Sequence, residues 1–241
     1  MSFEMVIPAL AFRTADNRLD LELTRTYAER AAETWTDRFI LSGSTALGDL
    51  LTVTERAVIL DVWSDVMEPS RLLACCWHRE DMEQAEHRNI LPVVVMQDLS
   101  DQAAACSFFA GLPAGAFVYS NPSFTPTPLH PALAAAANRQ GILPAGAKIS
   151  KIAVNDIGAM RASVGPQFTL WDGSSRHIGA SLTAGASGIV ATPLAVLPAP
   201  FPQRSIDELQ ATLHQLYAKV DGAASRADRM DLLTLLFRQP V

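Results

Sequence analysis

The chain has 241 residues, of which 49% are hydrophobic and 18% charged, and this composition is typical of one large globular domain. Its formal net charge of −6 argues against a nucleic-acid or anionic-membrane surface as a partner. No apolar run reaches the roughly 18 residues that a membrane-spanning helix needs. The first residues lack the charged and apolar regions of a signal peptide, so we expect a cytoplasmic protein.

Short apolar runs alternate along the chain with amphipathic stretches, a pattern that indicates repeated β–α units. Eight strands are predicted in this way, and a helix follows most of them. Eight buried strands at roughly thirty-residue spacing favour a closed (β/α)₈ TIM barrel over an open doubly wound sheet, which usually has fewer. In chain order, the prediction is strand 5–11, helix 19–34, strand 38–43, helix 54–67, strand 71–76, helix 79–88, strand 91–96, helix 101–110, strand 116–119, helix 131–139, strand 145–149, strand 168–171, helix 175–184 and strand 188–192.

Two further amphipathic helices are predicted after the last strand, at residues 206–220 and 226–237. We therefore expect an α/β barrel over residues 1–195 and a short C-terminal helical extension over residues 196–241 that packs on the barrel. The active sites of such barrels lie at the C-terminal ends of the strands, so unusual residues at those ends are candidates for chemistry.

Lys148 is the most informative of these candidates. It lies in Ala145-Gly146-Ala147-Lys148-Ile149, a predicted core strand, where burial disfavours its charged ammonium form. An uncharged amine in an apolar site is what nucleophilic attack on a ketone requires. Two other interpretations stay open from chemistry alone: the side chain could extend past the strand end to solvent, or could pair with a carboxylate.

The usage of basic residues favours the nucleophile. The chain has 16 arginines and only three lysines, so arginine serves wherever a surface cation suffices. Arginine cannot form an imine, so the presence of lysine rather than arginine at a buried strand position has a chemical explanation.

Several motifs, each weak alone, occur in order at matching intervals, and together they resemble the dihydrodipicolinate synthase / N-acetylneuraminate lyase family. The resemblance covers most of the chain and identifies it as a short, divergent member. The matching elements are residues 6–10 with 19–20, Gly43-Ser44-Thr45, Leu51-Thr52 with Glu55, Tyr119 with Pro122, Lys148, Gly173, and Gly185 to Ile189. Asn121 belongs to the same element as Tyr119 and Pro122 but stands one place later than the asparagine of the family motif.

This resemblance implies a Schiff-base aldolase or lyase that acts on pyruvate or another 2-oxo acid and an aldehyde acceptor. Lys148 would condense with the keto carbon, and Tyr119 and Thr45 would transfer protons. Backbone amides of Ser44 and Thr45 would hold the substrate carboxylate. The turn at Gly173 and Ser174 would complete the binding site. The resemblance implies no cofactor and no metal, and a homodimer or homotetramer.

Departures from the family pattern concern the acceptor. Ala46-Leu47 replaces a Gly-Glu pair, and Phe124 replaces the arginine that grips a second carboxylate in the lysine-pathway enzyme. No tyrosine follows the fourth strand, in residues 96–99, where the family's proton relay has one. We therefore do not expect true dihydrodipicolinate synthase activity. Leu47, Phe124 and Trp171 instead predict an apolar space beyond the imine and a less polar acceptor.

Two alternatives stay open for the function. One is a dehydratase that uses the same lysine and breaks a carbon–oxygen bond. The other is a catalytically reduced paralogue that binds a 2-oxo acid or a protein partner. Four possible metal ligands, His78, Glu80, Asp81 and His87, lie in a charge-rich stretch that favours a solvated helix face over a metal site.

Overall fold

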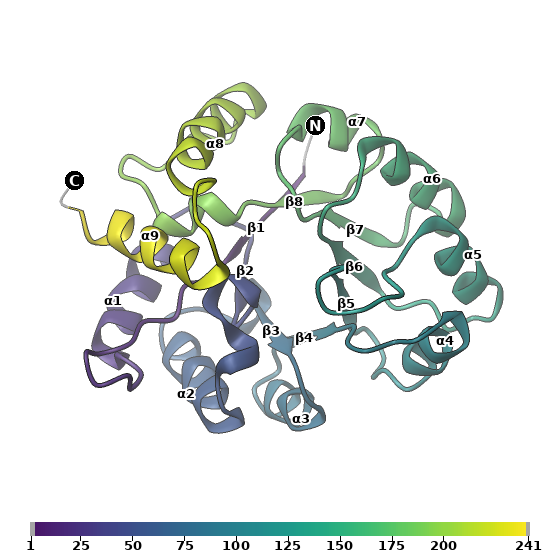
Figure 1. Ribbon diagram of the computed structural model, residues 1–241, viewed down its shortest axis with the longest axis horizontal. Helices are drawn as coiled ribbons and strands as arrows, with labels where there is room; N and C mark the ends of the chain where they lie inside the picture. Colours follow the sequence, from purple (N-terminus) through teal and green to yellow (C-terminus); the bar gives the residue numbers. More distant parts are fainter. Residues whose placement is uncertain (1–2, 240–241) are drawn as a thin grey trace. The chain divides into compact units, whose positions relative to one another are not determined.

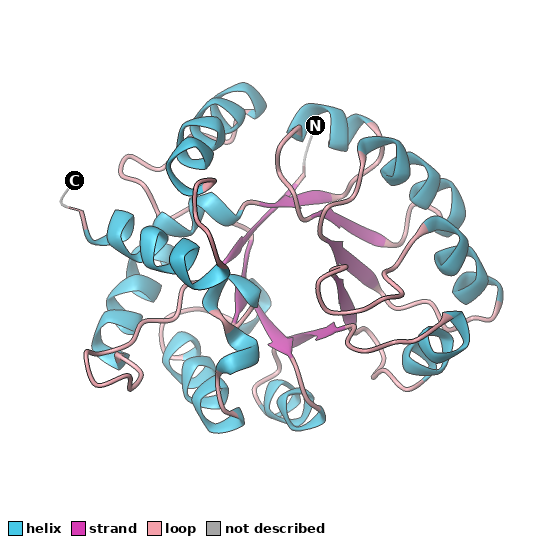
Figure 2. Cartoon of the chain, in the orientation of Figure 1, coloured by secondary structure: helices cyan, strands magenta, loops and turns pink. Residues whose placement is uncertain are grey.

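Eight parallel strands follow one another in the order β1 to β8 in a closed barrel in the computed structural model, which describes residues 3–239 (Figure 1). Figure 2 shows strands and helices alternating along the chain. The predicted (β/α)₈ barrel is therefore confirmed. The strands are β1 (Glu4–Pro8), β2 (Arg38–Leu41), β3 (Leu72–Cys76), β4 (Leu91–Val95), β5 (Phe117–Ser120), β6 (Gly146–Ile149), β7 (Thr169–Asp172) and β8 (Gly188–Val190).

The described residues group into two compact units, which we treat separately. The β1–β3 unit comprises residues 5–91 and 191–239, and the β4–β8 unit comprises residues 3–4 and 92–190. Within residues 3–239, no helix is long and apolar enough to cross a membrane. The helices are α1 (Leu21–Ala32), α2 (Val53–Ser64), α3 (Arg79–His87), α4 (Gln102–Ala110), α5 (Pro131–Arg139), α6 (Val154–Val164), α7 (Ile178–Thr183), α8 (Ile206–Val220) and α9 (Arg226–Arg238), with 3₁₀ turns η1 (Ser44–Ala46), η2 (Gly48–Leu50), η3 (Pro69–Arg71) and η4 (Thr192–Val196).

Helix starts follow local capping chemistry. Asp20 accepts a hydrogen bond from the Leu23 amide at 3.0 Å and so caps α1. Thr52 and Glu55 form a reciprocal capping box at the start of α2, so Thr52 is the N-cap of this helix. Partial burial of Glu55 opposes its charged form, yet the Thr52 amide and Arg13 lower the pKa of Glu55 from its ordinary value. Most helix and strand positions were thus predictable, whereas α6 is a helix that the sequence pattern did not indicate.

The two faces of the β4–β8 sheet have different roles. Val118, Ala147 and Leu170 belong to a buried cluster that also contains apolar residues of α4, α5 and α6. Successive residues of a strand point to opposite faces, so Tyr119, Lys148 and Trp171 lie on the other, inner face. The parallel register places Tyr119 beside Lys148 and Lys148 beside Trp171.

An aromatic cluster holds the C-terminal helix in the β1–β3 unit. The Phe237 ring on α9 lies 4.9 Å from the Tyr27 ring and 5.4 Å from the Phe12 ring. At the other end of α9, Arg226 makes two charged hydrogen bonds to Asp49, at 2.9 and 2.6 Å. Both predicted C-terminal helices are present, while the division of the chain at residue 195 stays a prediction.

We expect Phe237→Ala to lower the free energy of unfolding by about 3–5 kcal/mol, because it removes a buried ring from this cluster. Urea denaturation would measure the change. The control is Leu235→Ala on the same helix, whose side chain is 58% exposed and whose loss should change the stability by about 0.5 kcal/mol or less. Equal effects of the two variants would show that α9 does not pack through Phe237.

Candidate active site

Lys148 lies on the inner face of β6 and is only 3% exposed. Its Nζ lies 4.0 Å from the centre of the Tyr119 ring, within the range of a cation–π contact. Within residues 3–239, no carboxylate lies within ion-pair distance of this amine. The predicted burial is therefore confirmed, and neither a solvent-exposed amine nor a carboxylate-paired one describes Lys148.

Tyr119 is buried at the end of β5, and its hydroxyl has two polar neighbours in the same unit. The side-chain amide of Asn121 donates to the phenol oxygen at 2.9 Å, and the Ser150 hydroxyl lies 3.4 Å from it. Phe124 packs edge-to-face on the Tyr119 ring, with the two ring centres 6.0 Å apart. The structure thus brings together Lys148, Tyr119 and two polar side chains.

Trp171 does not line an open space, contrary to its predicted place in an apolar acceptor pocket. Its ring is fully buried and stacks on Phe117 at 4.7 Å, and its Nε1 donates to the Glu4 carboxylate at 2.7 Å. A Cβ on Gly146 would lie 2.3 Å from the Phe117 ring, so only glycine leaves room for this stack beside the lysine. Phe124, which is half-buried, is the apolar residue next to Tyr119.

The turn after β7 contains Gly173 and Ser174, the other predicted binding residues of this unit. The Gly173 amide donates to the Ile149 carbonyl at 2.9 Å, and a Cβ at Gly173 would lie 2.8 Å from that oxygen. The Ser174 amide donates to the buried Asp172 carboxylate at 2.7 Å, which also accepts from the Ser181 hydroxyl. These contacts fix the turn beside the end of β6, while a role for Gly173 or Ser174 in substrate binding stays a prediction.

Ser44 and Thr45 follow β2 in the β1–β3 unit, where they begin the turn η1. The Gly43 carbonyl accepts from the amides of Ala46 and Gly48, both at 3.0 Å, which curls the chain tightly. Leu47 takes a left-handed conformation with φ of 52° to continue the curl. A role for the Ser44 and Thr45 amides in holding a carboxylate stays a prediction.

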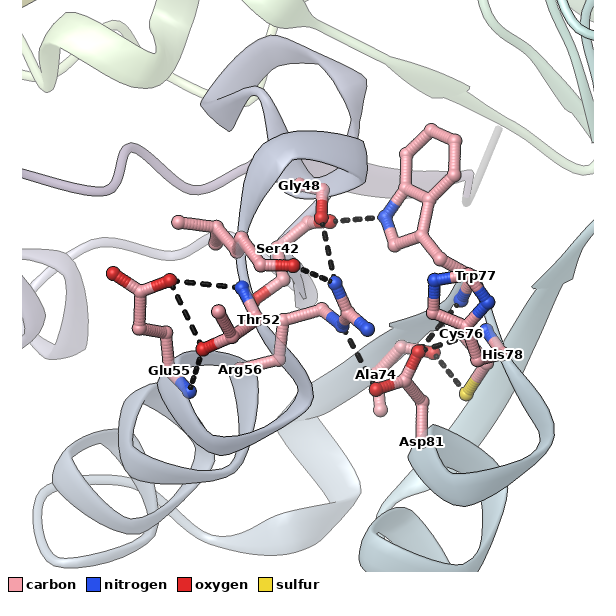
Figure 3. A network of polar contacts seen from close by, with 11 residues as sticks. Ser42, Gly48, Thr52, Glu55, Arg56, Ala74, Cys76, Trp77, His78 and Asp81 are labelled. Atoms are coloured by element: carbon pink, nitrogen blue, oxygen red, sulfur yellow. Dashed lines mark hydrogen bonds and ion pairs between the residues drawn. The ribbon is translucent and has the colours of Figure 1, made fainter.

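A buried ion pair supports this turn (Figure 3). Arg56 of α2 is 3% exposed, and its Nε donates to Asp81 of α3 at 2.8 Å. Its Nη1 donates to the carbonyl oxygens of Gly48 (3.0 Å) and Leu51, at the two ends of η2. One guanidinium therefore joins α2, α3 and the chain that follows η1.

Trp77 completes the network by contacting the chain that precedes the turn η1 (Figure 3). Asp81 accepts from the amides of Trp77 and His78, both at 2.9 Å, and the Trp77 indole donates to the Ser42 carbonyl at 2.8 Å. A Cβ at Gly48 would lie 1.7 Å from that same carbonyl oxygen, so only glycine fits there.

The sequence did not indicate this network. Asp81 lies in the charge-rich stretch that predicted a solvated helix face, and for Asp81 that prediction is wrong because the carboxylate is 4% exposed and bound to Arg56. Within residues 3–239, no group of three His, Cys, Asp or Glu side chains could hold a metal ion. The local sequence carries one signal for the Arg56–Asp81 pair: Asp81 is an acidic residue three places after His78, the N-cap of α3.

No family model matches the chain, and no curated protein matches it. Solved structures do match, over 97–98% of the chain. A protein of Coccidioides immitis assigned to the dihydrodipicolinate synthase family is 19% identical, is covered over 76% of its length, and has a TM-score of 0.72. A 2-keto-3-deoxygluconate aldolase variant of Sulfolobus solfataricus, in complex with pyruvate, is 18% identical, is covered over 85%, and has a TM-score of 0.75.

The sialic acid aldolase of Ruminococcus gnavus is 14% identical, is covered over 84% of its length, and has a TM-score of 0.80; its catalytic lysine mutant also matches. At these identities the likeness establishes the fold. The resemblance to the dihydrodipicolinate synthase family is therefore confirmed at the level of the fold.

We expect Asp81→Asn to destabilise the protein by about 3–5 kcal/mol, because it leaves the buried Arg56 guanidinium without its counter-charge. Asp61→Asn is the matched control: Asp61 pairs with Arg88 at 2.7 Å, but its side chain is 60% exposed, so about 1 kcal/mol or less is expected. Thermal unfolding of both variants tests this, and similar losses would mean that the buried pair does not support the fold.

Proposed function

We propose that the chain is a Schiff-base lyase of the dihydrodipicolinate synthase / N-acetylneuraminate lyase family, acting on a 2-oxo acid. The burial of Lys148 beside Tyr119, without a carboxylate partner in the part of the chain that the structure describes, is the observation that carries this proposal. Burying a cation without a partner is unfavourable, so a buried lysine of this kind calls for a chemical role. Two of the matching folds belong to aldolases, one in complex with pyruvate and one with a catalytic lysine.

The proposed reaction begins with attack of the Lys148 amine on the keto carbon of the 2-oxo acid. The carbinolamine that forms loses water to give an imine, and loss of a proton from the neighbouring carbon gives an enamine. The enamine adds to an aldehyde, or forms in the reverse direction when a carbon–carbon bond breaks. The hydroxyl of Tyr119, whose ring centre lies 4.0 Å from the amine, transfers protons in these steps.

The sequence resemblance, rather than a measured contact, assigns the carboxylate of the 2-oxo acid to the backbone amides of Ser44 and Thr45. It also assigns a proton-transfer role to Thr45 and binding roles to Gly173 and Ser174. The expected homodimer or homotetramer likewise stays a prediction. Phe124 favours an apolar or aromatic aldehyde over a charged one as the acceptor, because burial of a charged group against its ring would leave polar atoms unpaired.

We predict that borohydride reduction in the presence of pyruvate adds one reduced pyruvate to the protein at Lys148. Mass spectrometry of the intact protein and of its peptides would locate the adduct. Lys148→Arg keeps the charge but cannot form an imine, so it should remain unlabelled. Lys151→Arg is the control that should label normally, because Lys151 is exposed.

The outcome also separates the alternatives. Complete absence of an adduct with pyruvate and with larger 2-oxo acids would leave only the non-catalytic interpretation. An adduct together with loss of water from 3-deoxy-2-oxo acids, and no aldol cleavage, would establish a dehydratase.

Tyr119→Phe is predicted to slow proton transfer about 10²–10⁴-fold, the usual contribution of a general acid–base group, with little change in pyruvate affinity. Exchange of the pyruvate methyl protons with deuterated solvent, followed by NMR, measures this step without knowledge of the acceptor. Tyr217→Phe on α8 removes a hydroxyl elsewhere, and this variant should exchange the pyruvate methyl protons at the normal rate. Normal exchange in Tyr119→Phe would mean that another group carries the protons.

A further inference from the structure

Two side chains from different strand ends contact the Tyr119 hydroxyl. Asn121 follows β5 and donates its side-chain amide to the phenol oxygen at 2.9 Å, and Ser150 follows β6 with its hydroxyl 3.4 Å away. Both side chains are half-buried. The phenol oxygen is therefore located by hydrogen bonds in addition to the packing of its ring.

The orientation of the Asn121 amide is fixed by its own turn. Its Oδ1 accepts from the Ser123 backbone amide at 3.0 Å, and its carbonyl accepts from the Phe124 amide at 2.9 Å. A backbone N–H is always a donor, so the atom that faces Ser123 must be the oxygen and the atom that faces Tyr119 must be the nitrogen. Asn121 is thus held as a hydrogen-bond donor to the phenol.

Ser150 connects the same phenol to the strand of the lysine. It lies two residues after Lys148, and its amide donates to the Ser120 carbonyl at 2.9 Å, which extends the β5–β6 pairing. A displacement of the β6 end would therefore move the amine and one contact of the phenol together.

We infer that Asn121 and Ser150 are positioning residues that hold the Tyr119 hydroxyl for proton transfer at Lys148, an inference that rests on the proposed function. When the phenol gives its proton to the carbinolamine oxygen, negative charge develops on the phenol oxygen. A hydrogen bond to a charged oxygen is stronger than one to a neutral oxygen, so both donors favour this state. The Asn121 bond is the stronger of the two, because it is the shorter and has a fixed orientation.

This arrangement also explains one departure from the family motif. Asn121 stands one place later than the motif has its asparagine, and no tyrosine follows β4. The later position brings the amide to the phenol oxygen of its own chain. Polar groups of the same unit thereby support the hydroxyl that a second tyrosine supports in the family pattern.

The test is a double-mutant cycle measured by the exchange of pyruvate methyl protons. Asn121→Ala should lower the maximal exchange rate about 10- to 100-fold, the value of one hydrogen bond to a charged group, and leave the pyruvate concentration at half-maximal rate unchanged. Ser150→Ala should lower it less, because its contact is longer. In the Tyr119→Phe background, Asn121→Ala should have no further effect, because the oxygen that it contacts is absent.

Controls separate this inference from a structural role and from the proposed function. Asn138→Ala also removes a side-chain amide hydrogen bond, to the Ser163 carbonyl at 3.1 Å on the outer helices, and should exchange normally. An equal loss from Asn121→Ala in both backgrounds would overturn the inference, because it would show an effect independent of the phenol. Normal exchange in both Asn121→Ala and Ser150→Ala would overturn it as well. If the unmodified protein formed no borohydride adduct with pyruvate, the proposed function would fail first and the inference with it.

Discussion

The burial of a lysine amine without an acidic partner is the constraint that shapes the β4–β8 unit. Two other buried or half-buried cations of the chain donate to fixed acceptors, although one nitrogen of Arg56, Nη2, has no hydrogen-bond partner within residues 3–239. Arg56 binds a carboxylate and two carbonyl oxygens, and Arg161 binds three carbonyl oxygens and the Ser187 hydroxyl. The Lys148 amine has instead the face of an aromatic ring. A structural cation at this position would gain from the same kind of acceptors, so the absence of such acceptors among residues 3–239 favours chemistry over structure.

The surroundings of Lys148 keep this arrangement rigid. The stack of Phe117 on Trp171 fills the neighbouring space of the inner face, and it forms only because Gly146 has no side chain. On the outer face, the cluster of β5–β7 with α4–α6 fixes the same strands from the other side. Dense packing on both faces leaves little freedom to the backbone that carries Tyr119 and Lys148, which is what a preorganised proton transfer requires.

Much of the fold was predictable because strand and helix periodicities are local. The missing prediction, α6, has local causes as well: its cap, Ala153, offers no side-chain hydrogen bond, and Gly158 in its interior lowers the helix propensity of the segment. Its buried residues Ile157, Met160 and Val164 show the helical spacing once the bounds are known.

Lys148 was predictable because a lysine in an apolar strand is unusual by itself. The Arg56–Asp81 pair was not, because its members lie 25 residues apart and each resembles an ordinary charge on a helix. The contact of Asn121 with Tyr119 was hidden for another reason. In the sequence it is a displaced motif residue, and only the turn at residues 121–124 shows that the displacement brings the amide to the phenol.

Under the proposed function, that turn links proton transfer to the choice of acceptor. Its first residue, Asn121, holds the phenol oxygen, and its last, Phe124, packs on the phenol ring. The hydrogen bond from the Phe124 amide to the Asn121 backbone carbonyl fixes the distance between the two backbone positions. A residue at 124 that selected a charged acceptor would change the packing that orients Tyr119. The proposed function thus gives the apolar ring two roles, the orientation of the phenol and the exclusion of polar acceptors, and under that proposal a change of acceptor preference requires changes at both ends of the turn.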